Sequence, residues 1–253
     1  MSVRAPVFAG SFYPADKKVL SEVINDFLLQ AGGIKNVYKN AHVRALIVPH
    51  AGYVYSGATA AFSYNLLRNA KPKKIVLFGP SHYAYFRGAL GFSWEWQTPL
   101  GKQRVLSKGL NVLTSDKEHS LEVQLPFLQT VLSKFDFVPI IFGEISSQKL
   151  AQRIEEFLSS DTVLIASSDL SHYFSYDKAT RVDKATINSV LLLDLNEFES
   201  IGDACGKTGI GALIILARKN NWKCVLLDYK NSGDTAGDKS RVVGYCAIAF
   251  FEQ

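Results

Sequence analysis

Two short apolar runs, each stopped by a proline and followed by a histidine, constrain the fold of this chain more than any other feature. The first covers residues 45–48 and leads to His50, and the second covers residues 75–78 and leads to His82. Runs of this kind are typical of buried strands in a parallel sheet. In such sheets, ligands and metals gather in the crevice beyond the carboxyl ends of the strands. We therefore expect both histidines to lie at one edge of an α/β sheet.

The remaining sequence alternates between amphipathic stretches and further apolar runs. Helical spacing, caps and glycine stops predict helices over about 14–32, 56–70, 116–128, 146–158, 177–194 and 206–220. Apolar runs predict strands over 135–142, 162–167, 224–229 and 242–251, the last two as a pair. Strands that alternate with helices indicate a mostly parallel sheet with helices on both faces. Because no repeat or linker divides the 253 residues, we expect a single α/β domain over residues 1–253.

Three details of this prediction concern its boundaries and connections. Ser56 is the expected N-cap of the helix that ends near Ala70. Residues 83–105 are rich in glycine and tryptophan, and we expect a loop with an antiparallel excursion there. The polar, glycine-rich residues 231–241 predict a mobile connection between the last two strands.

Charge and cysteine content exclude several classes of protein. The net charge is +5, but its densest basic patch, residues 71–74, lies at a strand entrance, which argues against a nucleic-acid surface. The three cysteines are far apart in the sequence, and no two of them form a CxxC motif. This argues against a disulfide scaffold or zinc knuckle and fits a reducing cytosol. No apolar run has the length of a membrane span or the form of a signal core. We therefore expect a cytoplasmic protein that binds neither nucleic acid nor membrane.

Two further segments carry candidate ligands in addition to His50 and His82. Asp169 and His172 follow the predicted strand 162–167 with the spacing Asp-x-x-His, which suits metal ligation, orientation of another histidine or proton transfer. Cys205 precedes the predicted helix start at Gly206, and a helix N-terminus favours the thiolate that binds metals.

The segment Glu118-His119-Ser120-Leu121-Glu122 allows two interpretations. Glu118 and Glu122 share a helical face, where acidic groups either cap the helix or belong to a site. His119 is the member most able to reach the crevice. By contrast, His42 stands at a strand entrance and is expected at the surface, while Cys224 and Cys246 lie in apolar strands and are expected in the core.

Several segments of the chain resemble the MEMO family, whose prokaryotic members are also called AmmeMemoRadiSam system protein B. The resemblance runs from Phe8 to the C-terminal strand and so covers essentially the whole chain. It is carried, in order, by the motifs FAGSFYP (8–14), VPHAGYVYSG (48–57), GPSH (79–82), EHSLEVQLPF (118–127), SSDLSH (167–172) and ACG (204–206).

The resemblance implies a fold like that of the class III extradiol ring-cleaving dioxygenases and a site at His50, His82, His172 and Cys205. Those dioxygenases hold Fe(II) with two histidines and one carboxylate. Here the third position falls on Cys205, so the implied metal ligands are His50, His82 and Cys205. This set suits Fe(II) first, with copper or zinc as alternatives. The resemblance also implies radical-SAM and AMMECR-type partner proteins.

Two functions compete on these residues. In the first, the protein is a metal-dependent oxidoreductase of unknown substrate in which His172 acts as acid and base, Asp169 orients it and His119 assists. In the second, the same crevice binds a peptide, metabolite or partner protein without catalysis. Contact area for a ligand would then come from three aromatic residues, Tyr53, Tyr83 and Trp94. Metal storage or delivery without turnover is a third interpretation.

Overall fold

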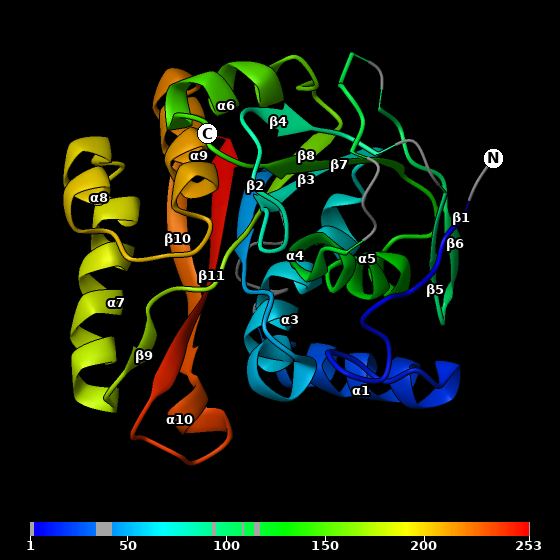
Figure 1. Cartoon of the computed structure of the whole chain (residues 1–253), viewed down its shortest axis with the longest axis horizontal. Helices are drawn as coiled ribbons and strands as arrows, with labels where there is room; N and C mark the ends of the chain where they lie inside the picture. Colours follow the sequence, from blue (N-terminus) through cyan, green and yellow to red (C-terminus); the bar gives the residue numbers. More distant parts are fainter. Residues whose placement is uncertain (1–2, 34–41, 93–94, 108, 114–116, 253) are drawn as a thin grey trace.

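The apolar runs of the sequence form the centre of a mixed sheet. The computed structural model describes residues 3–33, 42–92, 95–107, 109–113 and 117–252 (Figure 1). Within them, eight strands form the main sheet, in the order β10 (Lys223–Asn231), β11 (Val242–Glu252), β2 (His42–Val48), β8 (Thr162–Ser167), β3 (Lys74–Pro80), β7 (Asp136–Phe142) and β4 (Ala89–Leu90), with β9 (His172–Phe174) pairing with β11 beside this path.

Parallel pairing is confined to the middle of this sheet. Strands β2, β8, β3 and β7 are parallel to one another, whereas β10, β11, β9 and β4 are joined by antiparallel pairs. The predicted pairing of the last two strands is confirmed, with Cys224 opposite Phe250. The expectation of a mostly parallel sheet is corrected to a mixed one. The physical reason is that strands joined by a connection as short as residues 232–241 can only return antiparallel.

Helices cover both faces of the sheet, as expected. Along β2, Leu46 and Val48 pack into one core, and Ala45 and Ile47 pack into another, because successive side chains of a strand point to opposite faces. The first core includes residues of α1 (Lys17–Gln30), α3 (Tyr53–Ala70), α4 (His119–Glu122) and α5 (Leu125–Val131). The second includes residues of α6 (Ser147–Glu155), α7 (Tyr176–Leu191), α8 (Leu195–Ile201) and α9 (Lys207–Lys219). Figure 1 shows these two groups of helices on opposite sides of the strands.

Several boundaries differ from the sequence prediction. Helix α3 begins at Tyr53 after Gly52, not after Ser56, whose hydroxyl instead donates to the carbonyl of Ala51. The helix predicted to start near Asp116 is two short helices, α4 and α5, and Asp116 itself lies outside the described residues. Helix α8 was not predicted. The connection expected to be mobile contains the short helix α10 (Ser232–Thr235), which begins with a capping box at Asn231.

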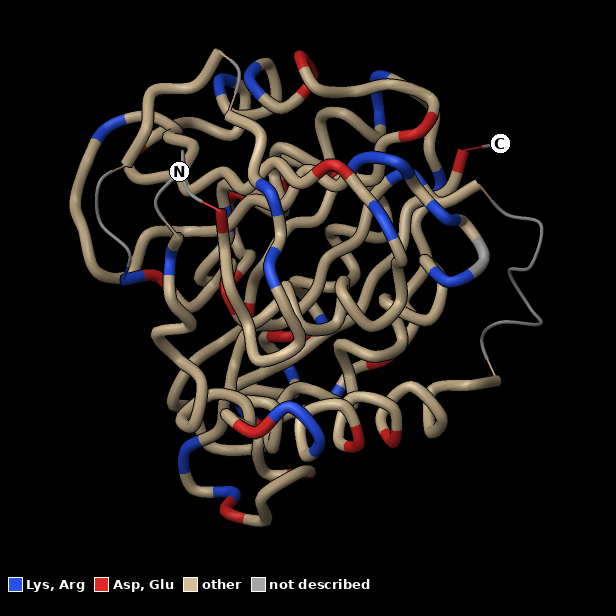
Figure 2. The backbone as a smooth tube through the Cα atoms, turned by 90° about the vertical axis from the view of Figure 1, so that its right-hand side faces the viewer, with Lys and Arg blue, Asp and Glu red and all other residues tan. Residues whose placement is uncertain are grey.

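A second, smaller sheet includes the antiparallel excursion predicted for residues 83–105. Its strands are β1 (Val3–Arg4), β5 (Glu95–Thr98) and β6 (Gly101–Gln103), and β5 and β6 are antiparallel. Figure 2 shows lysine and arginine spread along many segments of the backbone, with aspartate and glutamate between them. Among the helices that the structure describes, none is both long enough and apolar enough to cross a lipid bilayer.

The N-terminal segment is tied to α4 by one buried carboxylate. Glu122 is fully buried, and its carboxylate accepts hydrogen bonds from the backbone N–H of Phe8 and the hydroxyl of Tyr13, each at 2.7 Å. The guanidinium of Arg4, itself 3% exposed, forms an ion pair with the same carboxylate. Glu122 is therefore an anchor for the chain before α1, a role that the sequence analysis did not assign to it.

Candidate metal centre

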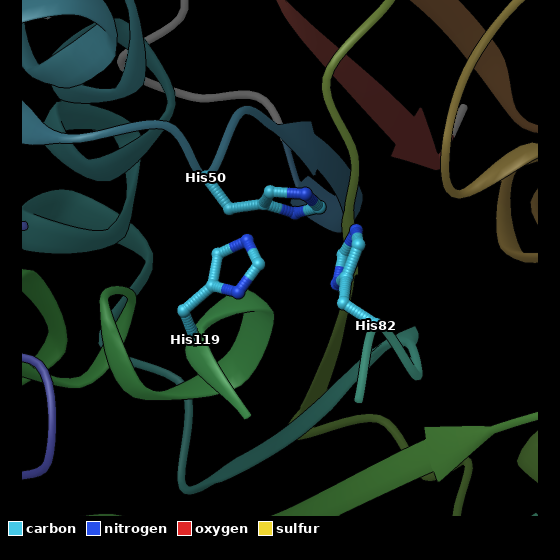
Figure 3. A group of neighbouring side chains, drawn as sticks. All are labelled: His50, His82 and His119. Carbon is cyan, nitrogen blue, oxygen red and sulfur yellow. The ribbon is translucent and has the colours of Figure 1, made fainter. Parts of the chain in front are cut away.

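Three histidines meet where the central strands end. His50 follows β2, His82 follows β3, and His119 is the first residue of α4. One possible ligand atom from each lies within 4.8 Å of the others. The ring centroids lie 5.2 Å apart for His50 and His82, 5.3 Å for His50 and His119, and 4.4 Å for His82 and His119. Figure 3 shows the three rings turned toward a common centre. The sequence prediction that His50 and His82 share one crevice agrees with this placement.

Glu118 fixes the orientation of His82. Its carboxylate accepts hydrogen bonds from the backbone N–H of His82 at 2.7 Å and from Nδ1 of the same ring at 3.0 Å. It also caps α4 through the N–H of Ser120. Burial alone would raise the pKa of the Glu118 carboxyl, but the hydrogen bonds from His82 lower it below its usual range. The ionised Glu118 carboxylate can only accept, so Nδ1 of His82 must carry the shared proton. In the neutral ring, Nε2 of His82 then has the lone pair that can bind a metal.

Ser167 fixes the orientation of the His50 ring. The Ser167 hydroxyl lies 2.5 Å from the carbonyl oxygen of Ser120, which can only accept, so its single proton is used there. The side-chain N–H of Gln124 donates to the same hydroxyl at 2.8 Å. Nδ1 of His50, 3.0 Å from the hydroxyl, must therefore be the donor in their contact. We assign the Nδ1–H tautomer to His50, which places the lone pair of the ring on Nε2.

His119 contributes a nitrogen that the protein itself does not satisfy. Nδ1 of His119 is buried and has no hydrogen-bond partner among the described residues, and Oε1 of Glu118 lies 3.5 Å away, outside bonding geometry. The ring packs against Phe12, with ring centroids 4.7 Å apart. A buried polar atom without a partner costs free energy unless a bound group pairs with it. The donor set of three imidazoles, one of them unsatisfied, fits a transition-metal ion.

Burial keeps two of these imidazoles neutral. Burial, followed by the proximity of His82, lowers the pKa of His50 to about 3. Burial, followed by the proximity of His50 and His82, also lowers the pKa of His119. A metal ion at neutral pH would therefore not compete with a proton for these two rings.

Cys205 contacts the group from the side of His50. Its Sγ lies 3.2 Å from Nε2 of His50, and the backbone N–H of Asp169 donates to the same sulfur at 3.2 Å. Burial, then the nearby Asp169, raises the pKa of the thiol to about 12. Without a cation beside it, Cys205 is thus a thiol that donates S–H to Nε2 of His50. Of the predicted ligands, Cys205 contacts His50, but the residue that the structure groups with His50 and His82 is His119.

Asp169 and His172 lie beside this group in different roles. The Asp169 carboxylate accepts from the backbone N–H of His50 at 2.7 Å and of Ala51 at 3.3 Å, so it holds the loop that carries His50. Burial raises the pKa of Asp169, and these two hydrogen bonds oppose that shift. That Asp169 also orients His172 stays a prediction. His172 is half-buried in β9 and faces a cavity.

A cavity of about 460 Å³ opens beside the three histidines. His119, Asp169 and His172 line it together with residues from both ends of the chain; the remaining lining residues are Phe12, Ala51, Gly52, Tyr55, Tyr173, Ser232, Ala236, Asp238, Arg241, Val243 and Tyr245. This volume is in the range of pockets for small organic ligands.

The aromatic residues predicted to contact a ligand fall in three different places. Tyr53 is buried in the core, where its hydroxyl donates to the carbonyl of Val123 at 2.7 Å, so it offers no surface to a ligand. Tyr83 is 51% exposed, with its ring centroid 5.7 Å from that of His119. Trp94 lies outside the described residues. His42 is exposed and Cys246 is buried, as predicted, whereas Cys224 is only partly buried where it packs against the second core.

Sequence reasoning missed the residues that orient the rings. Ser167 and Gln124 were not singled out, and Glu118 was considered only as a helix cap or an unspecified site residue. A signal for Ser167 was present, because a serine ends the predicted strand 162–167 immediately before the Ser168-Asp169 pair. Its meaning depends on the parallel pairing of β2 with β8, which places Ser167 opposite Val48.

Replacing Ser167 by alanine is expected to weaken metal binding about 10- to 100-fold, the usual effect of removing a partner that orients a metal-binding histidine. Among the described residues, the variant removes the one acceptor for Nδ1–H of His50, so the tautomer with the proton on Nε2 becomes accessible. Competition titration with a chelator measures the affinity, and nitrogen-15 NMR of labelled histidine reports the tautomer. Ser189→Ala, which removes a buried serine hydroxyl on α7, is the matched control. An unchanged tautomer would contradict the assignment.

Comparisons with known proteins agree over nearly the whole length of the chain. The model of the family described as Memo-like protein matches residues 4–249. A MEMO1 family protein of Nitrosopumilus maritimus is 37% identical over 275 aligned positions, covering 98% of this chain and 99% of the relative. A MEMO1 family protein of Thermoplasma volcanium is 36% identical and covers 99% of each chain. Another, of Sulfolobus acidocaldarius, is 36% identical over 98% of this chain and 99% of its own.

Proposed function

Because the chain belongs to the Memo-like family, we propose that it is a metal-dependent oxidoreductase whose metal ion is bound by His50, His82 and His119, with Cys205 as a further donor. The observation that supports this proposal most strongly is the convergence of three imidazoles within 4.8 Å. Two of them, His50 and His82, have Nδ1 engaged by a neighbouring side chain and Nε2 left as the available nitrogen.

The chemistry of the donors favours a redox metal. Imidazole suits iron, copper and zinc, and a thiolate from Cys205 would add a soft ligand. We propose Fe(II) as the first choice, with copper or zinc as alternatives. Bound iron or copper would supply one-electron redox chemistry that these side chains lack on their own. A fold like that of the class III extradiol dioxygenases, implied by the sequence resemblance, is part of this proposal.

The cavity beside the centre suggests where a substrate would be bound. His172 lines that cavity, and imidazole is a common acid–base group in enzymes, so we assign it the acid–base role. Asp169 holds the backbone of His50 and thereby keeps one ligand in place. His119 lies both in the metal group and in the cavity lining, so a molecule in the cavity would reach the centre at this residue.

A second function is favoured by the size and aromatic lining of the cavity. A binding protein without catalysis would use the same cavity for a metabolite or peptide, and the histidines would then serve as hydrogen-bonding groups. This alternative predicts that ligand affinity does not depend on a metal ion.

The test is elemental analysis of protein purified without oxygen, followed by reconstitution with Fe(II), Cu(I) and Zn(II). We expect about one metal ion per chain and oxygen consumption by the iron or copper form with phenolic substrates. If the protein retains no metal after reconstitution with any of the three ions, the metal proposal is overturned and the binding function remains. Stoichiometric zinc without oxygen consumption by the iron or copper form would overturn the redox part alone.

A further inference from the structure

The cavity beside the metal centre has an aromatic wall that the proposed metal chemistry does not use. Phe12, Tyr55, Tyr173 and Tyr245 are among its lining residues and come from segments that are far apart in the sequence. Tyr173 is 64% exposed and Tyr55 is 42% exposed, so both present ring surface to a molecule entering from solvent. Aromatic walls with a few polar groups are typical of sites for small organic molecules.

One cation, Arg241, lines the same cavity. Its guanidinium lies over the ring of Tyr173, 5.1 Å from the ring centroid. No ion pair of the described residues includes Arg241, and no hydrogen bond of its side chain to another described group is found. Its planar fork of N–H donors is therefore available for a ligand in the cavity.

Two neighbouring lysines have the same arrangement. Nζ of Lys178 lies 3.8 Å from the ring centroid of Phe174, and Nζ of Lys239 lies 4.6 Å from that of Tyr176. Arg241 and these lysines thus place three cations on aromatic faces around β9 and the start of α7. Neither lysine takes part in an ion pair among the described residues.

The acidic groups beside the cavity accept hydrogen bonds from groups other than Arg241; Asp169, which lines it, accepts from the backbone N–H groups of His50 and Ala51. Asp238, which also lines the cavity, accepts a hydrogen bond from the backbone N–H of Ser240 at 2.9 Å. Asp234 accepts from the hydroxyl of Tyr176 at 2.8 Å and from the backbone N–H of Asn231 at 2.9 Å. These carboxylates accept hydrogen bonds from nearby backbone N–H groups and a tyrosine hydroxyl, and none of them forms an ion pair with Arg241.

We propose that the cavity binds a small organic anion. Its carboxylate or phosphate is bound by Arg241, its apolar or aromatic body lies between Tyr55, Tyr173 and Tyr245, and its other end points toward His119. A planar guanidinium binds either kind of anion through two parallel hydrogen bonds, and the rings supply apolar contact area. The inference rests on the proposed function only in taking this molecule as the substrate of the metal centre; the binding itself needs no metal.

The test uses metal-free protein and four probes with the same ring: benzoate, phenyl phosphate, neutral benzamide and cationic benzylamine. Isothermal titration calorimetry measures each affinity. We expect benzoate or phenyl phosphate to bind about tenfold or more tightly than benzamide, because a charged acceptor strengthens the hydrogen bonds from a guanidinium. The stronger of the two anions shows whether the site prefers a carboxylate or a phosphate.

Three variants identify the residue responsible. Arg241→Gln is expected to remove the tenfold preference for the anion, and Arg241→Lys to retain part of it because the charge remains without the fork. Arg181→Gln, an exposed arginine on α7 outside the cavity lining, is the matched control and should bind as the wild type does. Circular dichroism melts confirm that each variant is folded.

The outcomes separate this inference from the metal proposal. His82→Ala, which does not line the cavity, should lose metal and keep benzoate binding, while Arg241→Gln should do the reverse. Three results would overturn the anion site and leave the metal proposal intact. They are an affinity for benzamide or benzylamine equal to that for the anions, no binding of any of the four probes, and an anion preference that survives in Arg241→Gln.

Discussion

Replacing His82 by alanine is expected to abolish stoichiometric metal binding by this protein. His82 is the ring that a buried carboxylate holds through both its backbone N–H and its Nδ1, so its Nε2 is the best oriented of the available nitrogens. Loss of one of three or four ligands leaves an incomplete coordination sphere. We expect the metal content, measured by elemental analysis after reconstitution, to fall from about one ion per chain to a background level.

His42→Ala is the matched control for this experiment. His42 is an exposed histidine at the start of β2, where its ring pairs with Glu252 at the opposite end of that strand from His50. The control should retain the wild-type metal content. Full metal content in His82→Ala would contradict the assignment of this residue as a ligand.

The same measurement distinguishes the two possible third ligands. His119 is grouped with His50 and His82 by distance, whereas Cys205 contacts only the Nε2 of His50 in that group. We expect His119→Ala to lose metal as His82→Ala does, and Cys205→Ser to retain metal at lower affinity. A reversed result, with metal lost in Cys205→Ser and kept in His119→Ala, would assign the third position to the thiolate predicted from the sequence.

Replacing Glu122 by alanine is expected to destabilise the fold by about 3–5 kcal/mol, the cost of removing one partner from a buried ion pair. The substitution leaves the Arg4 guanidinium buried without its carboxylate, and it also removes the acceptor of the Phe8 N–H and the Tyr13 hydroxyl. Urea denaturation followed by circular dichroism measures the change in the free energy of unfolding.

An exposed ion pair provides the comparison. Glu22 lies on α1 and pairs with Lys18 at 3.9 Å, with both side chains largely in solvent. Glu22→Ala is expected to change the free energy of unfolding by less than about 1 kcal/mol. If the two glutamate variants lost similar small amounts of stability, the N-terminal anchor described here would be wrong.

The strands of the central sheet were predictable because each is encoded by a local pattern. The apolar runs before His50 and His82 form β2 and β3, and the runs at 135–142 and 162–167 form β7 and β8, close to the expected limits. The order of the strands was not predictable. The C-terminal strand β11 lies between β10 and β2, a pairing between residues near 45 and 250 that no local pattern encodes.

The candidate site could likewise be predicted only in part. The positions of His50 and His82 followed from the strand exits, but the contribution of His119 depends on how α4 packs against those exits, where Ser120 donates to the carbonyl of Pro80. Tyr53 was misjudged because the helix was expected to begin only after Ser56, which left Tyr53 outside it. In the structure α3 begins at Tyr53, which turns this side chain into the core. Tertiary packing, not local propensity, decided both cases.

The position of β2 between a middle strand and the last strand has a consequence for synthesis. All three histidines are complete once the ribosome has made residue 119, but β2 is framed by β8 and β11, the second of which ends at Glu252. A nascent chain therefore carries the imidazoles long before it has the strands and Ser167 that orient them. The contact that orients His50 therefore forms only after β8 and its Ser167 have been synthesised and have paired with β2.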